Sequence, residues 1–362
     1  MKKISFGQLM ALLLICRFFT LMTYVPLISE GYGLTVQMAG TAASVLIQAA
    51  AGFILVALNR RHPCRNITEI AFIQSRTCGI ILSCAYFIFF VLSASNGLLH
   101  FQRFVTEIFL PHSSGIIIAL LIAAAAAYCA ALGIEGLARG CAVILFVFLA
   151  AAALLMAVSL PNGKLINFAF DASEAAFSLP EAISADLSRS GEIVLAGFAM
   201  KYIGGRSEEA NKGIFGYLAV KLAVLELVFG VMAVVLGDFM LMLRYPLLTL
   251  GSYTGLIQRF DAFYMIVWTL SSVVSCAVYI LFAADILTGA IPKLREKGCA
   301  AYISGAAVFA AALPYVIMRL SKADEYRLIL SQAGVLTAGL FVPLILLAAE
   351  KNPRKEAAAE NA

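Results

Sequence analysis

The sequence predicts an all-α polytopic membrane protein: ten transmembrane helices form a five-plus-five inverted repeat in which helices 1 and 6 are discontinuous. Of the 362 residues, 62% are hydrophobic and 13% are charged, and the mean hydropathy is +0.95. Soluble domains carry roughly 25% charged residues, so this composition indicates a membrane protein. The fold prediction depends on this composition, on ten apolar windows and on the charges inside the first window of each half.

The apolar windows approach the length of about 20 residues that a helix needs to span a bilayer. They cover residues 7–28, 34–58, 77–99, 114–134, 140–160, 189–205, 213–237, 262–288, 299–318 and 331–349. We expect a single transmembrane domain over 1–350, with a first repeat at about 7–160 and a second at about 189–349. A polar tail follows at 351–362.

The distribution of basic residues predicts the orientation. With ten crossings both termini lie on one side, and more than half of the Lys and Arg residues fall in the ends and loops of that side. The positive-inside rule therefore places both termini, and the tail, in the cytoplasm. The longest connection on the opposite side, residues 161–188, is acidic, and we expect short interfacial helices there.

The sixth window is interrupted by residues that disfavour one clean helix. Gly191, Glu192, Gly197 and Lys201 fall inside it, and its uninterrupted apolar run is Ile193 to Met200. One interpretation is a broken helix lining a polar cavity. The other is a short helix whose glycines allow close packing and whose charges lie at the two interfaces. The spacing alone leaves both open.

The first window carries Arg17 near its middle, followed by Thr20 and Pro26. An Arg at a helix centre costs about 2.5 to 3.5 kcal/mol on the insertion scale, which the surrounding Leu, Ile, Phe and Val residues offset. Charges in the first helix of both halves are typical of inverted-repeat transporters, whose unwound helices hold a small ligand near the midplane.

The other charged residues inside the apolar windows are weaker indications of a binding site. Lys221 is near one end of its window, and we expect it to extend to the interface. Glu226 lies deeper and, five residues on, faces away from Lys221, so a local ion pair between them is not expected. Asp285 is near a helix end, where we expect a solvated or loop-bonded carboxylate.

No chemistry beyond binding is indicated. The three histidines are too dispersed for a metal site, and nucleotide-binding and hydrolase motifs are absent from the sequence. We therefore expect no enzyme activity, no cofactor and no metal. The basic residues are scattered singly, which argues against nucleic-acid binding.

Four short stretches resemble the endospore germination permeases, the B subunits of spore germinant receptors. They are ISFGQ at 4–8, LPHSS at 110–114, GIEGLAR at 133–139 and RFDAFYMIVW at 259–268. The resemblance implies the fold of the amino acid, polyamine and organocation transporter superfamily. It also implies nutrient sensing in the inner membrane of the spore, together with A and C receptor subunits.

Two positions depart from the pattern of this family. Arg17 to Thr20 stand where family members commonly have a glycine in the first helix, and Ser113-Ser114 stand where a Thr-Pro is usual. In GIEGLAR we expect a tight turn with Glu135 and Arg139 at helical spacing.

The candidate ligand is a small nutrient, most simply an amino acid. Its carboxylate would bind backbone N–H groups near Gly191 or the side chain of Arg17, and its ammonium would bind near Glu192. The remaining candidate ligand-binding residues are Phe19, Thr20, Tyr86, Gly197 and Phe198, the three aromatic residues as an apolar wall.

Three functions remain open from the sequence. The first is a germinant sensor that signals through partner subunits. The second is a proton- or sodium-coupled amino-acid transporter, in which Glu192 or Glu226 would carry the proton. The third is a scaffold that only positions the other receptor subunits.

Overall fold

The computed structural model describes residues 4–22, 33–167, 172–203, 207–243, 245–253, 260–317 and 332–349. Within these ranges every regular element is a helix. The longest are α2 (Leu34–Arg61), α4 (Arg76–Phe104), α6 (Ile134–Ser159), α9 (Ser207–Leu236) and α11 (Phe260–Ala290). Three further apolar helices are α1 (Phe6–Met22), α5 (Gly115–Ala131) and α13 (Ala300–Ile317).

The remaining elements are short or interrupted. The last described segment consists of α14 (Gln332–Leu336), the π-helical turn η8 (Thr337–Phe341) and α15 (Val342–Ala349). Connecting helices are α3 (Ile67–Gln74), α7 (Ala172–Ser188), α8 (Glu192–Ala199), α10 (Pro246–Tyr253) and α12 (Pro292–Lys297). Single turns are η2 (Val105–Phe109), η3 (Leu160–Asn162), η4 (Leu165–Asn167), η5 (Met200–Ile203) and η6 (Gly237–Met242).

The observed helices follow the apolar windows closely. In the described part of the chain, seven helices are long and apolar enough to cross a membrane, and Phe6–Leu21 and Gly115–Ala131 are shorter apolar helices. The protein is therefore an integral membrane protein. Residues 23–28 of the first window lie outside the described residues. The count of ten crossings and the inverted repeat stay predictions.

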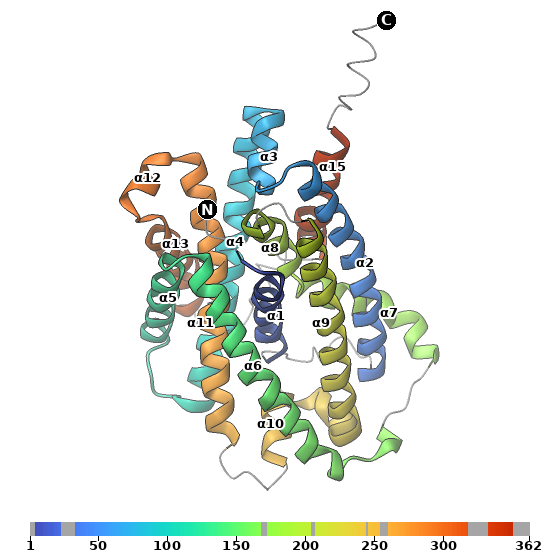
Figure 1. Cartoon of the computed structure of the whole chain (residues 1–362). Coiled ribbons are helices and arrows are strands. Elements are labelled where there is room, and N and C mark those ends of the chain that lie inside the picture. Colours follow the sequence, from blue (N-terminus) through green and yellow to red (C-terminus); the bar gives the residue numbers. More distant parts are fainter. Residues whose placement is uncertain are drawn as a thin grey trace, which may run out of the picture.

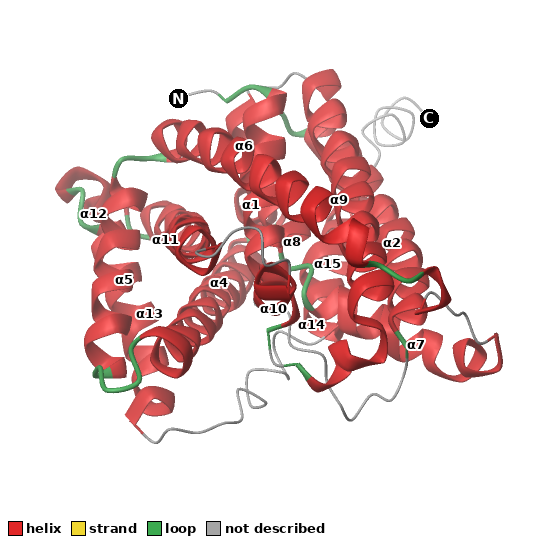
Figure 2. Cartoon of the chain, turned by 90° about the horizontal axis from the view of Figure 1, so that it is seen from below, coloured by secondary structure: helices red, strands yellow, loops and turns green. Residues whose placement is uncertain are grey.

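The helices form a bundle with α1 and α8 inside it. Seen from below, α1 and α8 lie among α2, α4, α6, α9 and α11, with α5 and α13 to one side (Figure 2). α1 packs against α6, α9, α11 and α8, and α2 packs along α9 and α7. α1 begins toward the upper end of Figure 1, and we call this the upper end of the bundle.

Close backbone contact brings α7 onto α2. A Cβ added at Gly40 of α2 would lie 2.6 Å from the Cβ of Ala182 of α7, so the two helices touch where no side chain intervenes. Small residues permit such approaches between membrane helices. The connection 161–188 was predicted to lie at the membrane interface, but its last helix, α7, packs against α2 in the bundle.

The turn before α6 has the predicted form. Gly133 has a φ of +86°, a conformation that L side chains rarely adopt. Arg139 donates to Glu135 one turn earlier on the surface of α6. The GIEGLAR stretch is therefore a helix start stabilised locally.

Candidate functional site

The sixth window, residues 189–205, begins with a break that separates α7 from α8. α7 ends at Ser188 and α8 begins at Glu192, so Arg189, Ser190 and Gly191 form a break. Tight backbone bonds run through it, from the Arg189 N–H to the Asp186 carbonyl and from the Ser190 N–H to the Leu187 carbonyl. α8 is buried along its whole length and then tightens into the 3₁₀ turn η5. The interruption agrees with the glycines and charges seen in the sequence.

α1 behaves differently from the expectation of a discontinuous first helix. It is continuous from Phe6 to Met22 and passes through Arg17 and Thr20 without a break. Any discontinuity in the rest of the first window would lie outside the described residues.

Arg17 forms an ion pair with Asp186 at the end of α7, and both side chains are almost completely buried. One Arg17 nitrogen also donates to Thr20 Oγ1 and to the backbone carbonyl of Arg189, each at 3.1 Å. Arg17 thereby ties α1 to the break. Its Nε–H is buried and has no hydrogen-bond acceptor among the described residues.

Lys221 of α9 forms the second buried ion pair. Its Nζ lies 2.8 Å from Glu192 Oε1, at the first residue of α8. Tyr217, one turn earlier on α9, donates to the same oxygen at 2.5 Å. The expectation that Lys221 extends to the membrane interface is wrong: the side chain is fully buried and turned into the bundle.

Polar side chains from α2 and the break join the two ion pairs. Ser44 donates to Asp186 Oδ2 at 2.5 Å. Gln48 donates to Ser44 and Ser190, and Lys221 donates to Gln48 Oε1 at 2.7 Å and to Ser190 Oγ at 2.9 Å. The set is named the central network and consists of Arg17, Ser44, Gln48, Asp186, Ser190, Glu192, Tyr217 and Lys221.

The central network is electrically balanced, with two cations and two anions. Burying a charge costs several kcal/mol unless it is paired and hydrogen-bonded, and here each charge has a partner of opposite sign. Five helices, α1, α2, α7, α8 and α9, and the break converge on it. A buried charged network inside a membrane protein marks a candidate binding site.

Two of the three predicted aromatic residues, Tyr86 and Phe198, pack together. Tyr86 and Phe90 of α4 each make an edge contact with Phe198 of α8, with ring centroids 5.0 and 4.9 Å apart. Tyr86 also donates to the Ala338 carbonyl at 2.6 Å. Phe19 is buried beside Gly97 of α4. Their role as a ligand wall stays a prediction.

The two predicted glycines have different surroundings. A Cβ at Gly191 would lie 3.2 Å from the Tyr279 hydroxyl, so Gly191 lies against α11 in the break. A Cβ at Gly197 would lie 2.5 Å from Ile67 Cδ1 and 3.1 Å from Leu55 Cδ2, so Gly197 lets α8 press against α3 and α2.

Glu226 is half-buried on α9 and lies outside the central network. Its Oε1 is buried without a hydrogen-bond partner among the described residues. As expected, it makes no ion pair with Lys221, which pairs with Glu192.

Five residues of the central network were not predicted from the sequence: Ser44, Gln48, Asp186, Ser190 and Tyr217. The position predicted for the Lys221 side chain was wrong. One signal was available for Lys221, which follows Tyr217 and precedes Leu225 at intervals of four residues on the buried face of α9. No comparable pattern of buried positions was used for Asp186, because the connection that contains it, residues 161–188, was predicted to lie at the membrane interface.

A second charged group lies nearer the upper end. Lys201 Nζ of η5 lies 2.6 Å from Glu69 Oε1 of α3 and 3.2 Å from Asp285 Oδ2 of α11. We name these three residues the Lys201 cluster. Asp285 was expected to be solvated or bonded to a loop: its side chain is 16% exposed, pairs with Lys201 and lies 3.4 Å from Nδ2 of Asn66, the residue before α3.

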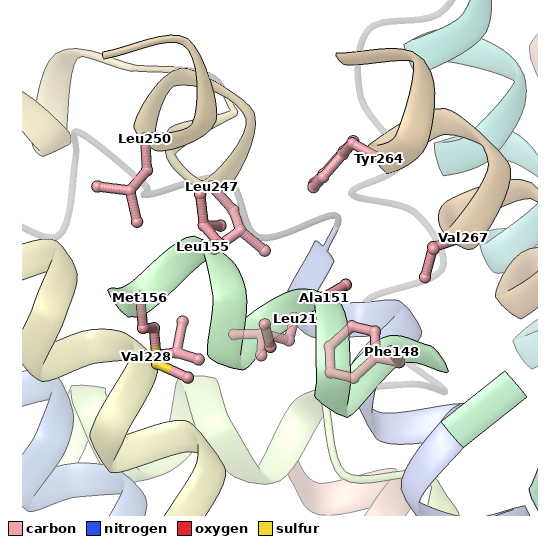
Figure 3. A pocket seen from close by; sticks show the side chains of 11 residues that line it. Leu21, Phe148, Ala151, Leu155, Met156, Val228, Leu247, Leu250, Tyr264 and Val267 are labelled. Atoms are coloured by element: carbon pink, nitrogen blue, oxygen red, sulfur yellow. The ribbon is translucent and has the colours of Figure 1, made fainter. Parts of the chain in front are cut away.

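An apolar cavity lies on the opposite side of the central network. It is partly open to the surface. Figure 3 shows Leu247 and Leu250 of α10 on one side and Leu155 and Phe148 of α6 on the other. Its walls are aliphatic and aromatic, so it suits an uncharged group.

Comparison with known proteins agrees with this architecture. The chain matches the family model described as spore germination protein over residues 38–318. No curated protein matches the chain in sequence. A solved structure titled as the substrate-bound, outward-open state of a Na⁺-coupled sialic acid symporter is similar with a TM-score of 0.59. The identity is 12%, and the match covers 93% of this chain and 85% of that chain, so it shows the fold alone. Since the family model spans most of the chain, this transporter-like membrane protein belongs to the spore germination protein family.

Proposed function

We propose that the chain is the B subunit of a spore germinant receptor in the spore inner membrane, with both termini cytoplasmic. It binds a small nutrient, an amino acid, at the central network and passes the resulting change of conformation to A and C subunits. The family supports the germination role, and the buried network supports the site.

The unpartnered Nε–H of Arg17 is the observation that carries the site assignment. A buried donor without an acceptor costs about 1 to 3 kcal/mol. A ligand carboxylate would accept from it and offset that cost. Arginine suits the task because its planar guanidinium binds carboxylates through two parallel hydrogen bonds.

The charge balance favours a zwitterion. A ligand carboxylate competes with Asp186 for Arg17, and a ligand ammonium takes the place of a cation beside Asp186 or Glu192. The net charge of the site then stays constant, and no ion is left buried alone. An anion or a cation by itself would leave an excess charge.

The apolar cavity supplies space for a nutrient side chain. Leu21 follows Arg17 by one turn on α1, and Val228 follows Lys221 by two turns on α9, and both line the cavity. The charged and uncharged ends of an amino acid thus have separate surroundings. The break at Arg189 to Gly191 is the element whose shape the ligand would bias.

The test uses spores in which the chain is deleted and then restored as wild type, as Arg17→Lys or as Arg139→Lys. Dipicolinate release is followed against a panel of single amino acids and sugars. Arg17→Lys keeps the charge but loses the Nε–H, and one charge-assisted hydrogen bond is worth about 1.5 to 3 kcal/mol. The half-maximal nutrient concentration is expected to rise at least about tenfold. Arg139→Lys, on the exposed surface of α6, is expected to match the wild type.

Two outcomes would overturn parts of the proposal. Normal germination without the chain, for every nutrient, would remove the receptor role. Wild-type dose dependence in Arg17→Lys, combined with failure on deletion, would favour the scaffold over the sensor.

A coupled amino-acid transporter is the second candidate. Its support is the likeness to a symporter fold and the buried, unpartnered oxygen of Glu226, which suits a carboxyl that gains and loses a proton. Sustained uptake into liposomes that contain only this protein, driven by a proton or sodium gradient and reduced in Glu226→Gln, would establish transport. Binding without uptake would reject it.

A further inference from the structure

The Lys201 cluster joins three elements at the upper end of the bundle. Lys201 comes from η5, directly after α8, whereas Glu69 comes from α3 and Asp285 from α11. The side chains are 14%, 36% and 16% exposed, respectively. Water therefore reaches this group, in contrast to the central network.

Both carboxylates are oriented by further hydrogen bonds. Asn66 and Glu69 form a capping box at the start of α3, in which Glu69 Oε2 accepts from the Asn66 N–H at 3.1 Å while Oε1 accepts from Lys201. Asn66 Nδ2 lies 3.4 Å from Asp285 Oδ2. The beginning of α3 thus presents a fixed acceptor to Lys201.

The same end of α8 is held by two other contacts. Gly197 packs without a side chain against Ile67 of α3. The Ile4 N–H donates to the Tyr202 carbonyl in η5 at 3.0 Å, which ties the residues before α1 to the same turn. Release of Lys201 would therefore free η5 and the start of α1 together, because they are bonded to each other.

From this geometry we infer that Lys201 is an ionic clamp that keeps the candidate site closed toward the upper end. The site opens to that side when Lys201 leaves Glu69 and Asp285. The identity of the ligand that enters through this opening rests on the proposed function. The ionic clamp itself can be tested without any ligand. Glu192 and Lys201 are nine residues apart, roughly 14 Å along a helix, so α8 can transmit a movement of η5 to the central network.

Three features identify this group as the part that moves. It contains one cation and two anions, so the ammonium is shared and can leave one carboxylate before the other. It is partly exposed, so water replaces the lost bonds. It also lies at the end of a helix of eight residues, α8, which has few bonds of its own to resist displacement.

Alkylation of the native Cys16 reports the opening. Cys16 is 2% exposed and precedes Arg17 on α1. The full chain in lipid nanodiscs, without any nutrient, is treated with a water-soluble maleimide, and modification of Cys16 is followed by mass spectrometry. Cys64, in the connection between α2 and α3, serves as the reference for reagent activity.

Lys201→Met is expected to accelerate Cys16 alkylation by about tenfold. Lys201→Arg keeps the charge and both acceptors, and the rate is expected to stay within about twofold of the wild type. Lys212→Met, which removes an exposed lysine of α9, is the matched control and is expected to change nothing. If Lys201→Met does not fold, Glu69→Gln and Asp285→Asn each remove one negative charge from the Lys201 cluster and are expected to give smaller accelerations.

Salt provides a test on the unaltered protein. Raising the ionic strength from 0.1 M to 1 M shortens the screening length from about 10 to about 3 Å. The wild-type rate is expected to rise with salt, whereas the rate in Lys201→Met stays constant. Equal rates in wild type and Lys201→Met at every salt concentration would overturn the clamp. Because no nutrient is present, that result would leave the proposed binding function untouched.

Discussion

The central network and the Lys201 cluster both join helices through charged side chains, but they differ in burial and in balance. The central network has two cations and two anions, all shielded from water. The Lys201 cluster has one cation between two carboxylates and is partly exposed. Charges without access to water must be satisfied by the protein itself, whereas exposed ones exchange partners with solvent at little cost.

This difference assigns the two regions different tasks. Six uncharged groups hydrogen-bond to the four charges of the central network, so it holds one geometry until something replaces a partner. The Lys201 cluster has few bonds per charge and is screened by salt. We therefore expect ligand dependence at the centre and salt dependence at the upper end.

The strongest way to break this comparison is to remove one central anion. Asp186→Ala leaves Arg17 buried without its counter-ion, and the free energy of unfolding is expected to fall by about 3 to 5 kcal/mol. Chemical unfolding in detergent micelles measures the change. Glu181→Ala, an exposed carboxylate on the same helix α7, is the control and is expected to stay within about 0.5 kcal/mol of the wild type. If Asp186→Ala and Glu181→Ala lower the free energy of unfolding by similar amounts, the ion pair of Arg17 and Asp186 does not contribute the stability expected of it.

Restoring neutrality sharpens the same test. Replacing both partners, as Arg17→Met with Asp186→Leu, removes the buried charges together. Most of the stability lost in Asp186→Ala is expected to return, because a buried ion pair can be replaced by apolar residues of similar volume. Nutrient response is expected to stay absent in this double variant.

The second prediction compares the two lysines directly. Lys221→Met leaves Glu192 buried with only Tyr217 as donor, and we expect a loss of about 3 kcal/mol. Lys201→Met breaks partly exposed contacts, and we expect about 1 kcal/mol or less. Unfolding measured at low and high salt separates them further, because only the contribution of Lys201 should shrink. The reverse order of the two losses would contradict the distinction between the regions.

The third prediction concerns the contact between α8 and its neighbours. Gly197→Leu places a side chain against Ile67 and Leu55, where a Cβ alone would already be too close. Overpacking of this kind is expected to cost about 1 to 3 kcal/mol. Gly140→Leu, at a position of α6 with open space around its Cα, is the control. Gly197→Leu is also expected to alter the germination dose response, since α8 carries Glu192; an unchanged response would separate α8 packing from ligand binding.

The smallest expected effect belongs to Tyr86→Phe. The change removes only the hydrogen bond to the Ala338 carbonyl in the π-helical turn η8. Thermal unfolding is expected to report a loss of about 1 kcal/mol. Tyr128→Phe, an exposed tyrosine of α5, should change nothing. A loss above that of Lys221→Met would mean that the aromatic group, and not the central network, is the dominant support of α8.

The sequence predicted the membrane class and the long apolar helices, and it marked the region around Glu192 as interrupted, although it did not predict α7. These follow from local properties: apolar windows of sufficient length, and glycines and charges that do not fit a single helix. Arg17 and Glu192 stood out for the same reason, because a charge inside an apolar window is visible without a structure. Glu135 and Arg139 pair as their spacing of four suggests.

Partner choice was decided by tertiary structure alone. Arg17 pairs with Asp186, which is 169 residues away, and not with Glu192; Glu192 instead pairs with Lys221. That choice follows from the contact of α7 with α2, which carries Asp186 into the bundle, and from the rotation of α9, which turns Lys221 inward. Local composition determines whether a segment enters the membrane, but the direction of a side chain within it depends on which helices pack around it.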